Sequence, residues 1–442
     1  MRASRKSSPR PAETLTTPIE TLAHDGRGVA HRDGKTVFIE GALPGESVSF
    51  TTLSRHNKYD EGRAEEIITP SSERVEPRCA HFGVCGGCSL QHLAADRQLD
   101  YKQAWLLDNL SRIGKVQPSQ VLEPLRGPHW AYRYKARLGV KYVPKKGRVL
   151  VGFRERNAPY LADLRRCEVL HPRVGGLLEA LAELVGSLSL AQQVPQIELA
   201  AGDETVALSF RVLRPPTEAD RARLTAFGQA HDLHIYVQPG GVRSTELLWP
   251  EHAQLSYRLP DHGLNLTFLP YHFMQINPAI NRQMVDRALN LLNVTPQDRV
   301  LDLFCGLGNF TLALARHARE VVGVEGDGEM VDWAQGNGQR NGIHNVRFYA
   351  DDLARLSEDS PWAQPSYDKI LLDPPRSGAL PILPRLAGLG AARIVYVSCH
   401  PATLARDAAE LVHRHGFRLV SAGVMDMFPH TTHVESIALF EA

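Results

Sequence analysis

The sequence lacks any run of about eighteen apolar residues, the length that a membrane-spanning helix needs, so we expect no membrane partner. Cysteine is scarce, with six among 442 residues, which excludes a disulfide-stapled secreted domain. The basic N-terminus, MRASRKSSPRP, has no apolar segment after it and is therefore no secretory signal; residues 1–14 are predicted to be a disordered tail. These absences indicate a cytoplasmic protein, which we expect to be a monomer.

The chain as a whole also has no large excess of positive or negative residues, because its formal net charge is only +1. Its distribution is uneven, since residues 126–173 hold thirteen Lys and Arg against three Asp and Glu, with six aromatic residues among them. Such a stretch suits a surface that follows RNA phosphates and stacks bases. The alternative is a solvated sheet face on which basic and core residues alternate, as in YRYKARLGVKY.

Three regions differ in their patterns. Short alternating runs such as KTVFIEG and ESVSFTTL, broken by glycine turns, predict a compact β-barrel at 15–69. The linker TPSSERVEP follows, and a central region at 70–272 contains a helical part near 97–129, which we expect to pack on the catalytic region, and then basic strands. From 273 to 442, continuous apolar runs alternate with helical patterns, which predicts a parallel α/β sheet covered by helices.

The first strand of this sheet ends in LDLFCGLGNF, where Gly306 and Gly308 allow a ligand close to the backbone. The third glycine of a dinucleotide fingerprint is missing, because Thr311 stands in its place. Glu325, at the end of the second strand, is placed to bind the ribose hydroxyls of an adenosine, and Asp352, after the third strand, could contact the adenine. Either acid could instead cap a helix. Together these features favour S-adenosylmethionine over a nicotinamide cofactor.

Two later segments carry candidate chemistry. LLDPPRSG places Asp373 before a stiff turn at the ligand-binding edge of the sheet. In VSCHPATLARD, Cys399 precedes a helix that is predicted to begin at Pro401, and the helix dipole favours a thiolate. A thiolate that adds to carbon 6 of uracil makes carbon 5 nucleophilic enough to take a methyl group, and Glu435 is a candidate base for the carbon 5 proton. Cys305 we interpret as a core thiol.

The remaining cysteines are Cys79, Cys85, Cys88 and Cys167, of which three share the segment RCAHFGVCGGC. Four thiolates can bind a [4Fe-4S] cluster or a structural zinc ion, and their spacing does not separate the two.

LDLFCGLGNF, LLDPPR, YVSCHPATLARD and MDMFPHTTHVES together resemble the RNA uracil-C5 methyltransferases, over nearly the whole chain. The resemblance implies a multidomain fold: an OB-like TRAM β-barrel that binds RNA, an α+β central domain with an Fe-S cluster, and a C-terminal Rossmann-like class I S-adenosylmethionine-dependent methyltransferase domain. Barrel and cysteines are similar to those of the bacterial members that methylate uridine 1939 of 23S ribosomal RNA, which implies ribosomal RNA as partner, with no DNA.

The resemblance further implies a role for each matching residue. Cys399 is the nucleophile and Glu435 the base; the four cysteines bind a [4Fe-4S] cluster; and the S-adenosylmethionine and site residues are Gln275, Phe304, Asn309, Glu325, Asp352 and Asp373. One departure is His400, where the family commonly has Asn. Arg376 replaces the aromatic residue that amine methyltransferases carry after their prolines, and the second cysteine of cytosine-C5 enzymes is absent. The alternatives are methylation of another ribosomal or transfer RNA uridine, and a cluster-bearing RNA-binding or assembly factor without turnover.

Overall fold

The computed structural model describes residues 14–355, 360–363 and 366–442. The tail predicted at 1–14 thus lies, apart from Thr14, outside the described residues. The chain divides into two compact units. The smaller comprises residues up to 83 together with 88–101 and 430–432, and the larger comprises 84–87, 102–429 and 433–442. No helix among the described residues is long and apolar enough to span a membrane.

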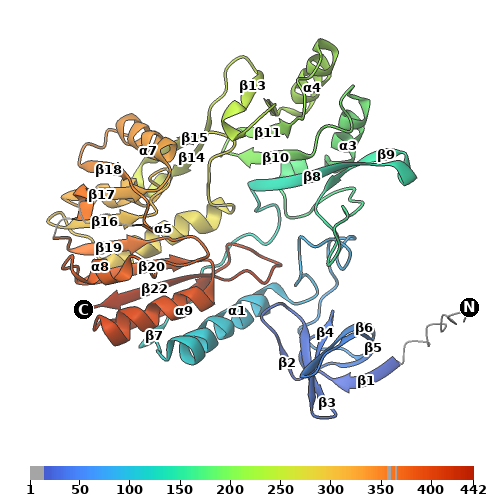
Figure 1. Ribbon diagram of the computed structural model, residues 1–442, viewed down its shortest axis with the longest axis horizontal. Coiled ribbons are helices and arrows are strands. Elements are labelled where there is room, and N and C mark those ends of the chain that lie inside the picture. The colour runs from blue at the N-terminus through green and yellow to red at the C-terminus, as the bar shows by residue number, and fades with distance from the viewer. Residues whose placement is uncertain (1–13, 356–359, 364–365) are drawn as a thin grey trace, which may run out of the picture. The chain divides into compact units, whose positions relative to one another are not determined.

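The smaller unit contains a six-stranded sheet in the order β1-β5-β6-β4-β3-β2 (Figure 1). The strands are β1 (Thr14–Pro18), β2 (Thr21–Leu22), β3 (Gly28–Arg32), β4 (Lys35–Glu40), β5 (Ser47–Arg55) and β6 (Tyr59–Thr69). The strands expected in KTVFIEG and ESVSFTTL are β4 and β5. Val37 and Ile39 alternate with more exposed neighbours along β4 and pack with Val48 and Phe50 in one small core.

A long helix, α1 (Ala95–Asn109), continues into the π-helical turn η1 (Leu110–Gly114). It confirms the first part of the helical stretch predicted near 97–129, and Trp105, Leu106 and Leu110 are buried along one stripe. The second part of that prediction is wrong, because residues 115–129 form no helix. Within the larger unit, η1 packs against helix α9 (Pro401–Ala409), where Gly114 is required because a Cβ there would lie 2.6 Å from the Ala405 carbonyl oxygen.

A second six-stranded sheet, in the order β13-β12-β11-β10-β8-β9, belongs to the larger unit. Its strands are β8 (Lys135–Val143), β9 (Arg148–Gly152), β10 (Gln196–Ala201), β11 (Val206–Arg211), β12 (His234–Gln238) and β13 (Glu246–Trp249). Helices α2 (Pro172–Gly175), α3 (Leu178–Ser187) and α4 (Glu218–His231) and the 3-10 turns η2 (Pro144–Lys146) and η3 (Val242–Ser244) connect them, and the hairpin β14 (Leu255–Leu259), η4 (Pro260–His262) and β15 (Leu264–Phe268) follows. Along β8, Leu138 and Val140 are buried whereas Arg137 and Lys141 are exposed.

The C-terminal sheet has eight strands in the order β18-β17-β16-β19-β20-β22-β21-β7. They are β7 (Gln120–Val121), β16 (Arg299–Leu303), β17 (Glu320–Glu325), β18 (Val346–Ala350), β19 (Lys369–Leu372), β20 (Arg393–Ser398), β21 (Arg418–Met425) and β22 (Glu435–Glu441). The five apolar runs predicted as strands are confirmed as β16 to β20, all parallel. The sheet is nevertheless not wholly parallel, because β22 runs antiparallel to both of its neighbours.

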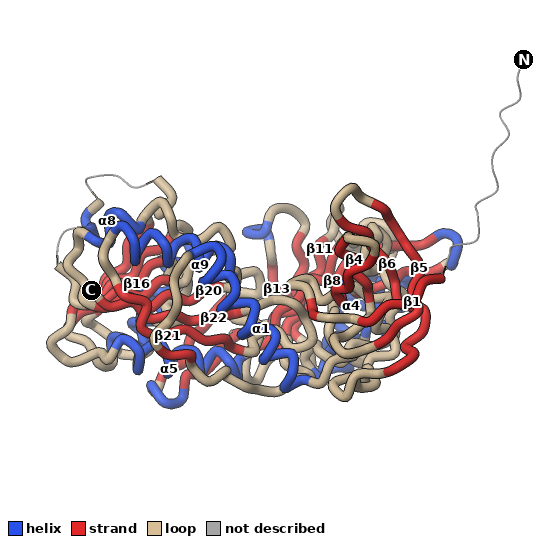
Figure 2. Tube along the Cα trace, turned by 90° about the horizontal axis from the view of Figure 1, so that it is seen from below, coloured by secondary structure: helices blue, strands red, loops and turns tan. Residues whose placement is uncertain are grey.

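The other elements of this region are α5 (Pro278–Leu292), α6 (Thr311–Ala315), α7 (Gly328–Arg340), α8 (Leu383–Ala387), η5 (Pro361–Ala363) and the π-helical η6 (Glu410–Arg414). Figure 2 shows α9 and α5 on opposite faces of the sheet. The sheet is thus buried on both faces, which accounts for the unbroken apolar runs of its parallel strands.

Candidate active site

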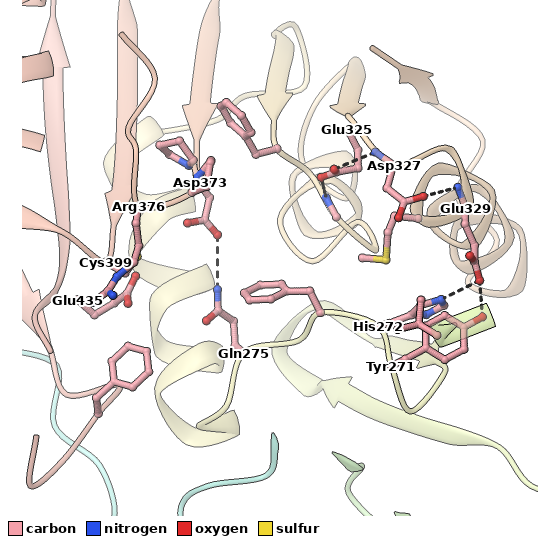
Figure 3. A pocket seen from close by; sticks show the side chains of 18 of the residues that line it. Tyr271, His272, Gln275, Glu325, Asp327, Glu329, Asp373, Arg376, Cys399 and Glu435 are labelled. Carbon is pink, nitrogen blue, oxygen red and sulfur yellow. Dashed lines mark hydrogen bonds and ion pairs between the residues drawn. The ribbon is translucent and has the colours of Figure 1, made fainter. Parts of the chain in front are cut away.

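A cavity of about 770 Å³ opens at the carboxyl ends of the parallel strands, in the larger unit (Figure 3). Both predicted catalytic residues and four of the predicted cofactor residues line it: Gln275, Phe304, Glu325, Asp373, Cys399 and Glu435. They come from segments up to 160 positions apart in the sequence, so the fold brings them together.

Strand pairing places the thiol beside the carboxyl group. Ser398, at the end of β20, pairs with Ser436 of β22, so that Cys399 and Glu435 follow opposite each other in the antiparallel register. Glu435 begins the last strand, as predicted, and α9 begins at Pro401. His400 is the N-cap of α9, since its Nδ1 accepts a hydrogen bond of 3.3 Å from the Thr403 amide. Histidine can therefore cap the helix at this position in place of asparagine.

The environment of Cys399 does not favour the thiolate, contrary to the prediction from the helix dipole. Burial and the neighbouring carboxyl groups of Glu435 and Asp373 raise the pKa of Cys399 to about 11, although Arg376 opposes them. Burial also raises the pKa of Glu435 well above its usual value, and Asp373 adds to this effect. The effect of burial and of the two carboxyl groups on the thiol pKa thus outweighs that of the dipole at the N-terminus of α9.

The segment after β19 supplies Asp373 and Arg376. Burial raises the pKa of Asp373 to about 7, and its Oδ2 accepts a hydrogen bond of 3.5 Å from Gln275 Nε2, which Figure 3 shows across the middle of the cavity. Arg376 Nη2 donates to His433 Nδ1 at 2.9 Å. One end of the cavity therefore holds the Cys399 thiol, the Glu435 carboxyl group and the Arg376 guanidinium, and the Asp373 carboxyl group lies between this end and the other.

The other end is built around Glu325 and the glycine turn. Glu325 Oε2 accepts a hydrogen bond of 3.1 Å from the Gly306 amide, and Oε1 accepts from the Gly326 amide at 2.7 Å. Asp327, and not Glu325, caps the following helix α7, which removes the capping alternative for Glu325. Phe304, Gly306 and Gly308 have φ angles of 65°, 55° and 87°, so the turn after β16 is left-handed at three positions.

Two predicted cofactor residues do not line the cavity. The Asn309 and Asn281 side chains exchange hydrogen bonds of 2.9 and 3.0 Å, and Asn309 Oδ1 also accepts from Tyr257 Oη. Asp352 Oδ1 accepts from the Ala354 amide at 3.0 Å, as in a turn or cap. The burial predicted for Cys305 is confirmed.

Sequence reasoning missed a second group of lining residues. Glu329 Oε1 accepts a hydrogen bond of 2.5 Å from Tyr271 Oη and lies 3.5 Å from His272 Nε2, and Arg243 Nε lies 2.9 Å from Glu329 Oε2. Glu329 lies in the first turn of α7, four residues after Glu325 at the end of β17, and this nearness to a predicted site residue is the signal that could have indicated it. Arg243 belongs to η3 in the central region, and no motif points to it.

The four cysteines are divided between the units, with Cys79 and Cys88 in the smaller and Cys85 and Cys167 in the larger. Cys85 Sγ accepts a hydrogen bond of 3.4 Å from the Gly87 amide, and both Cys85 and Cys167 pack against the core of the central sheet. Within the described ranges, no group of three or more His, Cys, Asp or Glu is arranged to hold a metal ion.

A mostly parallel sheet with a glycine turn after β16, an acid at the end of β17 and a cavity at the carboxyl ends of its parallel strands defines a class I methyltransferase fold. A solved structure supports this assignment: the tRNA (uracil-54, C5)-methyltransferase of Pyrococcus abyssi, in complex with S-adenosyl-L-homocysteine, superposes with a TM-score of 0.73 at 23% identity, covering 96% of this chain and 100% of that one.

The family follows from sequence similarity. The model for tRNA (Uracil-5-)-methyltransferase matches residues 229–442. The chain is 55% identical over 432 residues to the 23S rRNA (uracil(1939)-C(5))-methyltransferase RlmD of Alkalilimnicola ehrlichii, covering 98% of this chain and 97% of that protein. It is 54% identical to the protein of the same name from Methylococcus capsulatus, covering 99% of both. The chain belongs to the RNA (uracil-C5)-methyltransferase family.

Proposed function

We propose that this protein transfers the methyl group of S-adenosylmethionine to carbon 5 of uridine 1939 in 23S ribosomal RNA, in the cytoplasm. The observation that carries the proposal is the single cavity that holds Cys399 and Glu435 at one end and Glu325 at the other. The full-length similarity to proteins named for this reaction supports the choice of substrate.

The residues at the two ends fit the two substrates. Glu325 accepts backbone hydrogen bonds from the amides of Gly306, Gly326 and Asp327, and it keeps a lone pair on Oε2 for a ribose hydroxyl, next to the left-handed glycine turn. S-adenosylmethionine supplies an electrophilic methyl group when it is bound there. Because carbon 5 is inaccessible in a stacked base, the uridine must be flipped into the cavity.

Cys399 would attack carbon 6 as a thiolate, which pushes the electron pair of the C5=C6 bond toward the carbonyl at carbon 4. Carbon 5 then takes the methyl group, Glu435 removes the carbon 5 proton, and the thiolate leaves as the double bond returns. Because burial raises the pKa of both Cys399 and Glu435, each must lose a proton before it acts. Asp373, whose pKa is about 7, is the nearby group that can exchange protons at neutral pH.

The remaining residues of the site are assigned by the same reasoning. Gln275 and Asp373 lie between the two ends and are placed to orient uracil and cofactor, and Phe304 lines the cofactor end. For Asn309 and Asp352, whose side chains do not line the cavity, we propose indirect roles: Asn309 supports the glycine turn and Asp352 shapes the loop after β18.

The domain division that we propose is a TRAM-like barrel at 15–69, a central RNA-binding region at 70–272 and a methyltransferase domain at 273–442.

We further propose that Cys79, Cys85, Cys88 and Cys167 bind a [4Fe-4S] cluster. Four thiols are the number of ligands that such a cluster needs, and an amide that donates to Cys85 Sγ is typical of cluster ligands. Purification without oxygen should give four irons and four sulfides per chain, and Cys167→Ala should lose them; stoichiometric zinc would refute the cluster.

Transfer of labelled methyl groups to 23S RNA that lacks the modification tests the function. Wild type and the matched variant Cys305→Ala, whose thiol lies outside the cavity, should label carbon 5 of one uridine, and Cys399→Ala should label none. Glu435→Gln should accumulate a covalent complex with RNA that survives denaturing electrophoresis, because the carbon 5 proton stays in place. Label on another uridine or on transfer RNA would show that the substrate differs from the one proposed. A protein that still binds the cofactor but labels no RNA would instead be an assembly factor.

A further inference from the structure

The loop that follows Asp373 is held by side chains of helix α9. Asp407 is completely buried, and its Oδ2 accepts hydrogen bonds of 2.6 Å from the Ala379 amide and 2.7 Å from Tyr396 Oη. Thr403 Oγ1 donates to the Arg376 carbonyl oxygen at 3.2 Å. Both ends of the segment 376–379 are thereby bonded to one face of α9.

Arg406 completes this attachment. Its Nε donates to Asp407 Oδ1 at 2.8 Å and its Nη2 donates to the Ser377 carbonyl oxygen at 2.8 Å. Gly378 lies directly against the pair with a φ of 79°, and a Cβ there would come within 2.6 Å of both Arg406 Nη2 and Asp407 Oδ2. The loop is therefore closely fitted to the Arg406–Asp407 pair.

Helix α9 also positions the thiol, because Cys399 lies two residues before its first turn. We propose that Arg406 and Asp407 are positioning residues that hold the 376–379 loop so that the Arg376 guanidinium faces the Cys399 thiol. The inference rests on the proposed function in taking Cys399 as the nucleophile. Arg376 and Cys399 line the same cavity, and one helix fixes both.

Such positioning matters because Arg376 is the cation that counters the acidic surroundings of Cys399. Glu435 from β22 and Asp373 from the end of β19 disfavour the thiolate, together with burial, whereas Arg376 favours it. Burial lowers the pKa of the two neighbouring imidazoles, His400 and His433, which are therefore uncharged near neutral pH. A displaced Arg376 would leave the thiol with fewer favourable charges.

The test measures alkylation of Cys399 by iodoacetamide against pH in the full-length protein, quantified by mass spectrometry of the Cys399 peptide. Arg406→Gln is a mild change, because the side chain is 40% exposed. We expect it to raise the apparent pKa of the thiol and to slow alkylation at pH 8.5 by about threefold, which corresponds to about half a pKa unit. The matched control is Arg414→Gln, because the Arg414 side chain is 75% exposed and pairs with Glu410 in η6, immediately after α9.

A double-mutant cycle separates positioning from a general loss of structure. If Arg406 acts through Arg376, then Arg376→Gln alone and the double variant Arg376→Gln/Arg406→Gln should alkylate at the same rate. A wild-type profile for Arg406→Gln, or an equal further loss in the Arg376→Gln background, would overturn the proposal. Asp407→Asn should behave like Arg406→Gln where a thermal melt shows that it folds. Alkylation needs neither RNA nor S-adenosylmethionine, so failure of the proposed methylation would leave this result interpretable.

Discussion

At the scale of single residues, burial decides which acidic side chains of the methyltransferase region keep their protons. Asp302 on β16 is completely buried, and desolvation raises its pKa to about 8 even though Thr311 Oγ1 donates a hydrogen bond of 2.5 Å to it. Burial also raises the pKa values of Cys399 and Asp373. The proposed active site is thus protonated at rest, and its chemistry depends on removing protons.

The rate of methyl transfer should therefore rise with pH. A thiol with a pKa of about 11 gains thiolate up to tenfold per pH unit below that value, and ionisation of Asp373 near pH 7 adds a proton acceptor. We expect single-turnover rates with pre-bound RNA to increase from pH 6.5 to 9. Burst measurements on the same RNA at constant ionic strength check this; a plateau below pH 8 would mean that bound substrate lowers the thiol pKa.

Asp302→Asn should gain stability relative to wild type as the pH rises. Between the ordinary pKa of 3.8 and the folded value of about 8, the folded protein keeps a proton that the unfolded chain has lost. The free energy of unfolding of the wild type therefore falls in this window, by at most about 1.4 kcal/mol per pH unit. Asparagine does not ionise and can still accept the hydrogen bond from Thr311. Urea unfolding of both proteins at pH 5.5, 7 and 8.5 measures the difference, which should grow steadily; a constant difference would exclude ionisation of Asp302.

At the scale of elements, the sequence predicts a helix or strand well where nearby residues determine it, and poorly where residues distant in the sequence do. Strands β16, β17, β19 and β20 were predictable because burial on both faces selects continuous apolar runs, whereas the edge strand β18 is only partly buried. The order of the sheet of β8 to β13 was not predictable, because its hairpins β8–β9 and β10–β11 are joined by the pairings β8–β10 and β11–β12, which connect segments that are distant in the sequence. Asn309 shows the same limit within the site, because its side-chain amide bonds to Asn281, 28 positions earlier, and no local pattern indicates this partner.

Helix α1 contributes a buried ion pair whose loss should be costly. Lys102 is completely buried, its Nζ lies 3.1 Å from Asp426 Oδ1, and it also donates to the Phe428 carbonyl oxygen at 2.9 Å. Lys102→Met would leave the Asp426 carboxylate buried without this cation, so we expect a loss of about 3–5 kcal/mol in the free energy of unfolding. Arg112→Met is the control, because this side chain is 79% exposed and its pair with Asp108 contributes below about 1 kcal/mol. Denaturant unfolding of the two variants gives the comparison, and equal losses would contradict it.

At the scale of the whole larger unit, the central region and the C-terminal sheet build the cavity together. Val242 and Arg243, from η3, line it alongside residues 271–435, and Arg243 bonds to Glu329. No sequence pattern could reveal this contribution, because it depends on where the central sheet places the η3 turn. The basic residues exposed on β8 belong to the same region, so under the proposed function RNA binding and the Glu325 end of the cavity would depend on one sheet.

The salt dependence of RNA binding should show whether the exposed face of β8 contacts phosphates. Arg137 is 71% exposed and Lys141 is exposed on the same face, whereas their alternating neighbours are buried. If both contact phosphates, Arg137→Ala and Lys141→Ala should each weaken binding to any RNA sequence and lower the slope of log K against log salt by about 1. Arg414→Ala, on η6, is the matched exposed arginine outside this face and should leave the slope unchanged. Titrations between 50 and 300 mM salt, an interval chosen to span physiological ionic strength at about 150 mM, give these slopes. The slope reports the counterions that are released where a protein charge contacts a phosphate. Unchanged slopes for both β8 variants would therefore show that Arg137 and Lys141 are only solvated.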